Sequence, residues 1–146
     1  MHALPHEYTV AAAAAATGSV ALSGPGLPPL ETGAPPQFGG PGGQWSPETL
    51  LVGAAADCLI LTFRAVAGAS SLAWIELQCG ATGTLERVEG VTRFTQLALH
   101  AFLKVPEGTD TQKARRLVEK AEKACLVTNS LALTPSLTID VQTIGG

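Results

Sequence analysis

The feature that most constrains this chain is an apolar helix, which we expect to begin at Ser46-Pro47-Glu48 and to end near Ala69. Serine is a favoured N-cap, proline fits the first helical position, and a glutamate in the first turn interacts favourably with the helix dipole. The segment ETLLVGAAADCLILTFRAVAG is apolar on nearly every side. Such a helix belongs at the centre of a core or in an interface between subunits.

Length and composition favour one compact domain with much hidden surface. The 146 residues suit a single domain, which we assign to residues 1–146. Apolar residues make up 46% of the chain and charged residues only 14%, against a usual charged share of about 25%. This composition excludes disorder as the main state. It also indicates more hidden surface than one subunit of this size provides alone.

Charge argues against two classes of partner. Nine basic and twelve acidic residues give a net charge of −3, so we expect no nucleic-acid binding. The segment Met1–Tyr8 has no lysine or arginine, which is unlike a secretory signal. The apolar stretch around Leu50–Ala69 makes a poor membrane span because polar side chains interrupt it: Asp57, Thr62 and Arg64. We therefore expect no membrane partner.

The rest of the chain is predicted to form strands and one further helix. Segments 8–16 and 19–23 favour a hairpin. Residues 24–47 form a loop, because 14 of these 24 residues are glycine or proline. Alternating runs at 73–85 and 91–105 predict antiparallel strands. An amphipathic helix capped by Thr109 or Asp110 runs to Cys125, and a strand follows at 136–141. This pattern predicts an α+β fold.

Three cysteines are the candidates for chemistry. Cys58, Cys79 and Cys125 are an odd number at wide spacing with no CxxC pair, which favours a reducing compartment, and we expect a cytoplasmic protein. A lone cysteine in an apolar helix is most often packing. Cys58, however, follows Asp57, and Cys125 precedes the polar residues Thr-Asn-Ser. Packing remains the expected role of Cys79. The histidines show no metal-ligand spacing, and we expect neither a metal nor a cofactor.

Two segments carry a family resemblance. PPQFGGPGGQWSPETLLVGAAADCLILTF (residues 35–63) and KAEKACLVTNSL (residues 120–131) resemble the OsmC/Ohr family of thiol-dependent peroxidases, in the order that the family has them. The resemblance covers nearly the whole chain. It implies an OsmC-like fold of antiparallel sheets, a long buried central helix and a second amphipathic helix, assembled as an intertwined homodimer with active sites at the subunit interface.

The resemblance also implies residue roles. Cys58 matches the peroxidatic cysteine, whose thiolate attacks an organic hydroperoxide and becomes a sulfenic acid. Cys125 matches the resolving cysteine that forms the disulfide, and an external dithiol then reduces that disulfide. Glu48 matches the active-site glutamate of the family. Such a cycle protects cells against oxidative stress, and it is chemically sound because a thiol near a sulfenic acid closes to a disulfide before overoxidation.

Two observations qualify these roles. Glu48 and Cys58 are ten residues apart in one helix, or about 15 Å in rise, so Glu48 reaches the thiol only from another subunit or through a bend at Gly53. The family's N-terminal arginine is missing, since the first arginine is Arg64. A buried thiol without a positive neighbour is expected to have a raised pKa. Arg64 of a partner subunit, or less favourably His6, is the remaining cation.

Two alternatives stay open beside the peroxidase. The same dimer with inert cysteines would bind a small hydrophobic ligand at its interface, and the missing arginine favours this interpretation. The second alternative is that Glu48 is an ordinary first-turn glutamate that stabilises its helix. A cysteine hydrolase lacks support, because it needs a histidine base and His100 is the only internal candidate.

Overall fold

The chain forms two compact units, which we describe separately. The structure is a computed structural model, and it describes residues 1–145. The first unit comprises Met1–Leu50 and the second Leu51–Gly146. The boundary falls within the first turn of helix α1, which spans Pro47–Ala69.

The N-terminal unit contains a small antiparallel sheet. Its strands β1 (Ala11–Ala13), β2 (Val20–Ser23) and β3 (Leu30–Thr32) pair in the order β1-β2-β3. The β1–β2 hairpin is the one predicted from the sequence, and pairing overrides the helix propensity of its alanines. The glycine- and proline-rich segment contributes only the edge strand β3 and a short 3₁₀ turn, η1 (Pro36–Phe38).

Helix α1 begins and ends where the sequence predicts. The Ser46 hydroxyl accepts a hydrogen bond from the Thr49 amide at 3.1 Å, and the Ser46 amide donates to Thr49 Oγ1 at 2.8 Å. This reciprocal pair satisfies free donors at the helix start. The helix ends at Ala69, and Ser71 two residues later takes a left-handed φ of 52°.

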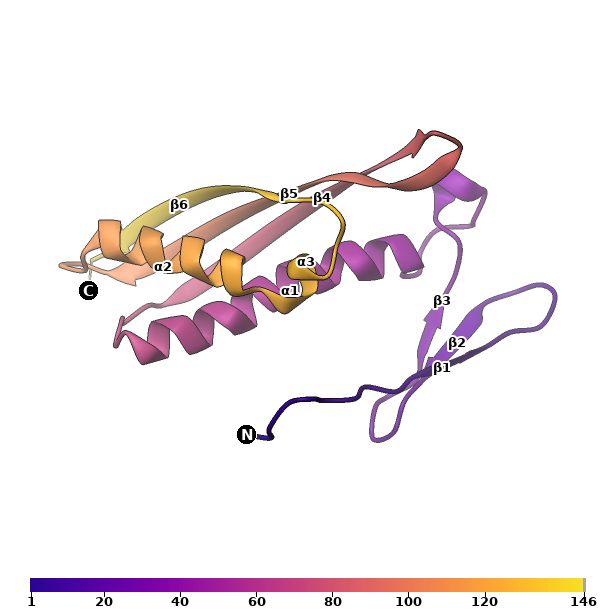
Figure 1. Cartoon of the computed structure of the whole chain (residues 1–146), viewed down its shortest axis with the longest axis horizontal. Coiled ribbons are helices and arrows are strands. Elements are labelled where there is room, and N and C mark those ends of the chain that lie inside the picture. The colour runs from indigo at the N-terminus through magenta and orange to yellow at the C-terminus, as the bar shows by residue number, and fades with distance from the viewer. Residues whose placement is uncertain (146) are drawn as a thin grey trace. The chain divides into compact units, whose positions relative to one another are not determined.

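The C-terminal unit is built on a three-stranded sheet in the order β4-β5-β6 (Figure 1). Strands β4 (Glu76–Val88) and β5 (Val91–Pro106) form an antiparallel hairpin. The hairpin turns at Glu89 and Gly90, whose φ values of 51° and 79° match a two-residue primed turn. Strand β6 (Ser136–Ile144) pairs parallel to β5, so this sheet is mixed. The parallel return is possible because a helical crossover connects the two strands.

That crossover consists of two helices. Helix α2 spans Thr111–Ala124 and is capped by Asp110, whose carboxylate accepts from the amides of Gln112 and Lys113 at 3.0 and 3.1 Å. The short helix α3 spans Leu126–Asn129. The α+β class predicted from the sequence is confirmed.

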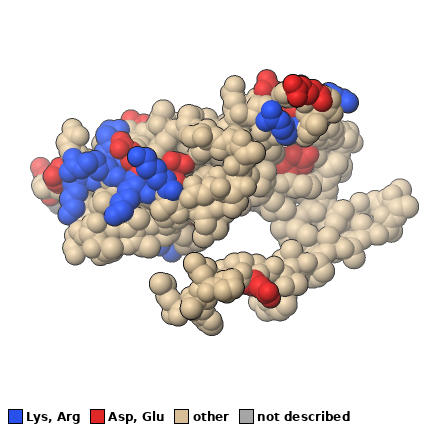
Figure 2. All heavy atoms as spheres, in the orientation of Figure 1, with Lys and Arg blue, Asp and Glu red and all other residues tan. Residues whose placement is uncertain are grey.

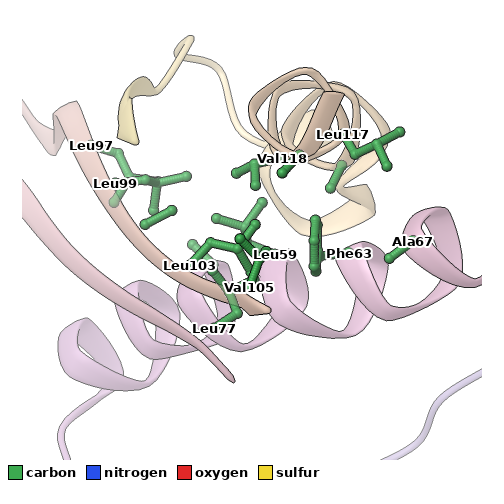
Figure 3. Close-up of a cluster of buried hydrophobic side chains, with 14 residues drawn as sticks. Leu59, Phe63, Ala67, Leu77, Leu97, Leu99, Leu103, Val105, Leu117 and Val118 are labelled. Carbon is green, nitrogen blue, oxygen red and sulfur yellow. The ribbon is translucent and has the colours of Figure 1, made fainter. Parts of the chain in front are cut away.

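The hydrophobic core lies between one face of this sheet and helices α1 and α2. Alternate residues of β5 point inward, whereas α1 contributes every fourth residue and α2 a stripe of similar spacing, as their periodicities require. Figure 3 shows these side chains pointing toward one another: Leu59, Phe63 and Ala67 from α1, Leu117 and Val118 from α2, and Leu97, Leu99, Leu103 and Val105 from β5.

Helix α1 buries only one face within this chain. Its buried residues are Ala55, Leu59, Phe63 and Ala67, and Leu61 on another side is 53% exposed. Among the described residues α1 is the one helix long and apolar enough to cross a membrane by length and composition. The core helix of a soluble protein meets the same criterion. Much of the apolar surface noted in the sequence is therefore on α1.

Basic side chains gather over α2, a distribution that the net charge does not reveal (Figure 2). This helix carries five of the nine lysines and arginines of the chain. Two of them bind main-chain carbonyls, because Lys113 Nζ donates to Ser70 O at 3.1 Å and Arg115 Nη1 donates to Ile139 O at 2.7 Å. These two bonds fasten α2 to the end of α1 and to strand β6.

Gly83 in β4 gives a prediction about the packing of the hairpin. A Cβ at this position would lie 2.8 Å from both Phe94 and Val52, whereas a Cβ at Gly80 would meet nothing within 4 Å. We expect Gly83→Ala to lower the free energy of unfolding by about 1–3 kcal/mol, because a well-packed site cannot accept an added methyl group without strain. Gly80→Ala is the matched control on the same strand and should be neutral. Urea denaturation measures both, and equal effects would contradict this packing.

Candidate active site

Cys58 lies in the middle of α1 and is half-buried. Its Sγ is 3.7 Å from the hydroxyl of Thr62, one helical turn further along. Residues four apart on a helix are neighbours, so this pair follows directly from the sequence spacing. The thiol is therefore held beside a hydroxyl that can donate a hydrogen bond to its thiolate.

Cys125 lies at the junction of α2 and α3 and is fully buried. Its carbonyl accepts hydrogen bonds from the amide of Asn129 at 3.0 Å and from the hydroxyl of Thr128 at 3.2 Å. The Asn129 side chain also donates to Lys123 O at 3.0 Å. The polar residues noted after Cys125 thus fix the backbone at the turn between the two helices.

The fold brings Cys58 and Cys125 together, although 67 residues separate them. Burial raises the pKa of the Cys58 thiol, but hydrogen bonds to its sulfur from the Val127 amide, the Cys125 side chain and other donors lower it by more. The pKa of Cys58 therefore lies below the ordinary thiol value. The sequence predicted a raised pKa for a thiol that lacks a cation; that prediction is wrong, because hydrogen-bond donors take the place of a cation.

The other two thiols have the opposite shift. Burial raises the pKa of Cys125, and the neighbouring Cys58 raises it further, against smaller lowering effects of Thr128. Burial likewise raises the pKa of Cys79, which packs against the core. Of the two thiols, Cys58 is thus the one that ionises at lower pH. A reactive thiolate beside a second thiol is an arrangement that can form a disulfide after oxidation.

Glu48 lies in the first turn of α1 and belongs to the N-terminal unit. Its Oε1 is buried and has no hydrogen-bond partner among the described residues. A buried carboxylate oxygen without a partner costs free energy, so this atom calls for an explanation beyond helix stabilisation. Cys58 and Cys125 belong to the C-terminal unit, so their site is described without Glu48.

The candidate cations do not contribute to the pKa of Cys58. The groups that set this pKa are hydrogen-bond donors and burial, with no charged side chain among them. Arg64 is exposed on α1. His6 is exposed in the N-terminal unit, where its ring nitrogens pair with Tyr8 and with the carbonyl of His2.

His100 is engaged elsewhere. It points away from the core on β5, pairs with Asp140 at 2.8 Å and stacks on Phe102 at 4.2 Å between ring centroids. His100 is therefore not a base for the Cys58 thiol, and its position does not support the interpretation as a cysteine hydrolase. Within residues 1–145, no group of three or more His, Cys, Asp or Glu side chains is placed to hold a metal ion.

Sequence reasoning missed the donors that surround Cys58. Thr62 lies four residues after Cys58, a spacing that predicts their contact. From the sequence it was considered only as a polar side chain that interrupts an apolar helix. The backbone of Val127 and Leu126 also lowers the pKa of Cys58. Backbone amides leave no sequence signal, and only the packing of α3 against α1 brings them to the thiol.

The Thr62 hydroxyl gives a prediction about thiol reactivity. We expect Thr62→Val to raise the pKa of Cys58 and to slow its alkylation by iodoacetamide at pH 7 several-fold, about 1 kcal/mol for one hydrogen bond to a thiolate. Thr62→Ser keeps the hydroxyl and should retain the wild-type rate. In the wild type, alkylation of Cys58 should rise at lower pH than that of Cys79 or Cys125, because a lowered pKa gives thiolate at lower pH. Mass spectrometry identifies the site, and equal rates for the three thiols would contradict this assignment.

Comparisons with known proteins identify the family and the fold. The family model described as OsmC-like protein matches residues 40–140. The chain is 28% identical over 100 residues to the uncharacterized protein YmaD of Bacillus subtilis, a match that covers 66% of this chain and 67% of that protein.

Solved structures share the fold. An OsmC-like protein of unknown function from Vibrio cholerae superimposes with a TM-score of 0.83 at 16% identity, covering 93% of this chain and 100% of that one. An organic hydroperoxide resistance protein OsmC from Legionella pneumophila does so with a TM-score of 0.75 at 24% identity, covering 97% and 100%. Fold and family model agree, and the chain belongs to the OsmC-like protein family.

Proposed function

We propose that this protein is a thiol-dependent peroxidase that reduces organic hydroperoxides. The observation that carries the proposal is the meeting of Cys58 and Cys125, of which only Cys58 has a lowered pKa. A peroxidatic cysteine must be a thiolate at neutral pH, while a resolving cysteine need only be near it. The different environments of the two thiols fit these different roles.

The cycle has three balanced steps. The Cys58 thiolate attacks the outer oxygen of the hydroperoxide, the O–O bond breaks, and the products are a sulfenic acid at Cys58 and an alkoxide that takes up a proton as the alcohol. The Cys125 thiol then attacks the sulfenic sulfur, which forms the Cys58–Cys125 disulfide and releases water. An external dithiol reduces this disulfide through exchange and becomes oxidised itself.

Apolar side chains and related proteins support an organic substrate. Leu126, next to Cys125 in the chain, is 70% exposed, and α1 around Cys58 is almost wholly apolar. Solved relatives from Legionella pneumophila and Elizabethkingia anophelis are named organic hydroperoxide resistance proteins. An alkyl or lipid hydroperoxide matches such a surface better than hydrogen peroxide does, because apolar contact is the main source of its affinity.

We propose a homodimer in the cytoplasm as the working form. The cysteines Cys58, Cys79 and Cys125 are free thiols, as suits a reducing compartment. The alternative is a catalytically weak dimer that binds a small hydrophobic ligand at its interface, since a single chain offers little apolar space. The apolar pocket lined by Leu51, Val52, Phe94, Leu97, Leu131 and Leu133 has a volume of about 10 Å³, which is roughly the space of one water molecule.

The test is a thiol count after one equivalent of cumene hydroperoxide is added to the reduced protein. We expect rapid loss of two thiols and a Cys58–Cys125 crosslink in the peptide map. With excess hydroperoxide, Cys125→Ser should instead accumulate the sulfinic acid of Cys58, because no thiol traps the sulfenic acid before a second equivalent oxidises it.

Two further variants complete the design. Cys58→Ser should abolish peroxide consumption, and Cys79→Ser is the matched control that should leave it intact. Three thiols still free after many minutes in the wild type would refute the peroxidase and leave the ligand-binding alternative.

Glu48 provides a separate prediction. If its carboxylate serves the reaction, Glu48→Gln should slow peroxide consumption at least tenfold while the free energy of unfolding changes little. An ordinary first-turn glutamate would give the reverse, a loss of about 0.3–1 kcal/mol of stability with an unchanged rate. Peroxide assays and urea denaturation of the same variant decide between these roles.

A further inference from the structure

Helix α2 carries a row of unpaired cations on its exposed side. Arg116, Lys120 and Lys123 follow each other by four and three residues, which places them on one side of the helix. All three are exposed, and we call this set the basic stripe. Among the described residues none of the three is in an ion pair, although Glu119 and Glu122 lie on the same helix. The charges of the basic stripe are therefore available to a partner.

The basic stripe is a positive region on an acidic chain. Helix α2 has five basic and two acidic side chains, whereas the whole chain has a net charge of −3. Lys113 and Arg115 bind the main-chain carbonyls of Ser70 and Ile139, so the helix is held in place and the stripe with it. These cations form a fixed positive surface (Figure 2). A surface of this kind attracts and orients a partner of opposite charge.

The basic stripe ends beside the two thiols. Lys123 is two residues before Cys125, and two residues of chain span at most about 7 Å. Leu126, which follows that cysteine, is 70% exposed. Cys125 is fully buried and Cys58 is half-buried, so a dithiol that reduces their disulfide must approach a partly covered sulfur. A carrier held by the adjacent charges would raise the local concentration of its dithiol at this sulfur.

An anionic membrane fits α2 less well than a protein does. A helix that lies in a membrane surface buries an apolar face among the lipids while its basic residues face the headgroups. The apolar face of α2 is already occupied, because its residues Ala114, Leu117, Val118 and Ala121 are buried in the core of this chain. The exposed Leu126 is a single apolar side chain next to charged ones, which is typical of a contact between proteins.

We propose that the basic stripe of α2 docks an acidic protein that carries the dithiol which reduces the Cys58–Cys125 disulfide. The proposal rests on the disulfide of the proposed function and names the partner of that same site.

The exchange that the docked carrier performs has two balanced steps. A thiolate of the carrier attacks the Cys58 sulfur, which is the less buried of the two. The Cys58–Cys125 bond breaks, and Cys125 leaves as a thiolate that takes up a proton. The second thiolate of the carrier then attacks the carrier's own sulfur in the mixed disulfide, which forms the carrier disulfide and releases the Cys58 thiolate. Two electrons thus pass from the carrier to this protein.

Dithiol peptides of different charge test the docking. The probes share a Cys-Gly-Pro-Cys centre and are flanked on both sides by glutamates, glutamines or lysines. Each rate is divided by the rate of the same peptide with dithiodipyridine, a neutral disulfide, which removes differences in thiol pKa. In a Cys79→Ser chain, diamide forms the Cys58–Cys125 disulfide, so no peroxidase activity is needed.

The expected order of rates is opposite to the order that the net charge favours. At an ionic strength of about 10 mM, where charges act over about 30 Å, the glutamate peptide should reduce the protein at least about tenfold faster than the lysine peptide. The difference should nearly vanish at about 1 M salt, where charges act over about 3 Å. The net charge of −3 alone would favour the lysine peptide. Equal rates of all the peptides at low salt would overturn the proposal.

A matched pair of double variants assigns the effect to the basic stripe. K120Q/K123Q should slow reduction by the glutamate peptide at least about fivefold, while the rate with uncharged dithiothreitol stays at the wild-type value. R87Q/R93Q removes the same charge from exposed positions near the turn of the β4–β5 hairpin and should leave both rates unchanged. An equal fall in the two variants would show an effect of net charge alone and overturn the proposal.

Binding of a probe that cannot reduce separates docking from exchange. The glutamate peptide with serines in place of its cysteines should bind the wild type at low salt, measured by fluorescence anisotropy, and should not bind K120Q/K123Q. No binding to the wild type would overturn the docking. This measurement needs neither peroxide nor a disulfide, so failure of the docking and failure of the proposed activity are separate results.

Vesicles provide the membrane arm of the test. Vesicles with about one third phosphatidylglycerol, an anionic lipid, should not sediment the protein at low salt. Sedimentation that K120Q/K123Q abolishes and R87Q/R93Q retains would assign the basic stripe to a membrane and overturn the protein partner.

Discussion

The packing of α1 against the sheet is the constraint on which the rest depends. Its buried residues at every fourth position fix the rotation of the helix, and that rotation places Cys58 neither in the core nor fully in solvent. A thiol one residue earlier or later in the helix would be turned by about 100°. The position of the reactive sulfur is therefore a consequence of core packing.

Helix α2 completes the site because it ends at Cys125. Lys113 and Arg115 fasten α2 to the end of α1 and to β6, so the turn at Cys125 is held at a fixed position. The amides that follow it then reach Cys58. A fixed set of donors lowers a thiol pKa without the reorganisation cost of a mobile charged side chain. The family resemblance predicted an arginine that lowers the pKa of the reactive thiol. In this chain, backbone groups contribute to that lowering instead.

Sequence reasoning recovered elements well and contacts poorly. The caps at Ser46 and Asp110 and the alternation in β5 are local signals, and they located the helices and strands to within a few residues. The parallel pairing of β6 is not local, because it depends on how a helical crossover returns the chain. The lowered pKa of Cys58 was also missed, since it depends on backbone groups 68 and 69 residues further along that residues of almost any type provide equally.

The distinction between local and non-local signals also explains why the sequence predicts that α1 is buried on nearly every side. Its composition is apolar on nearly every side, whereas the chain covers only the face that holds Ala55, Leu59, Phe63 and Ala67. The polar residues that seemed to interrupt the helix, Asp57 and Arg64, fall on the face that the chain leaves uncovered.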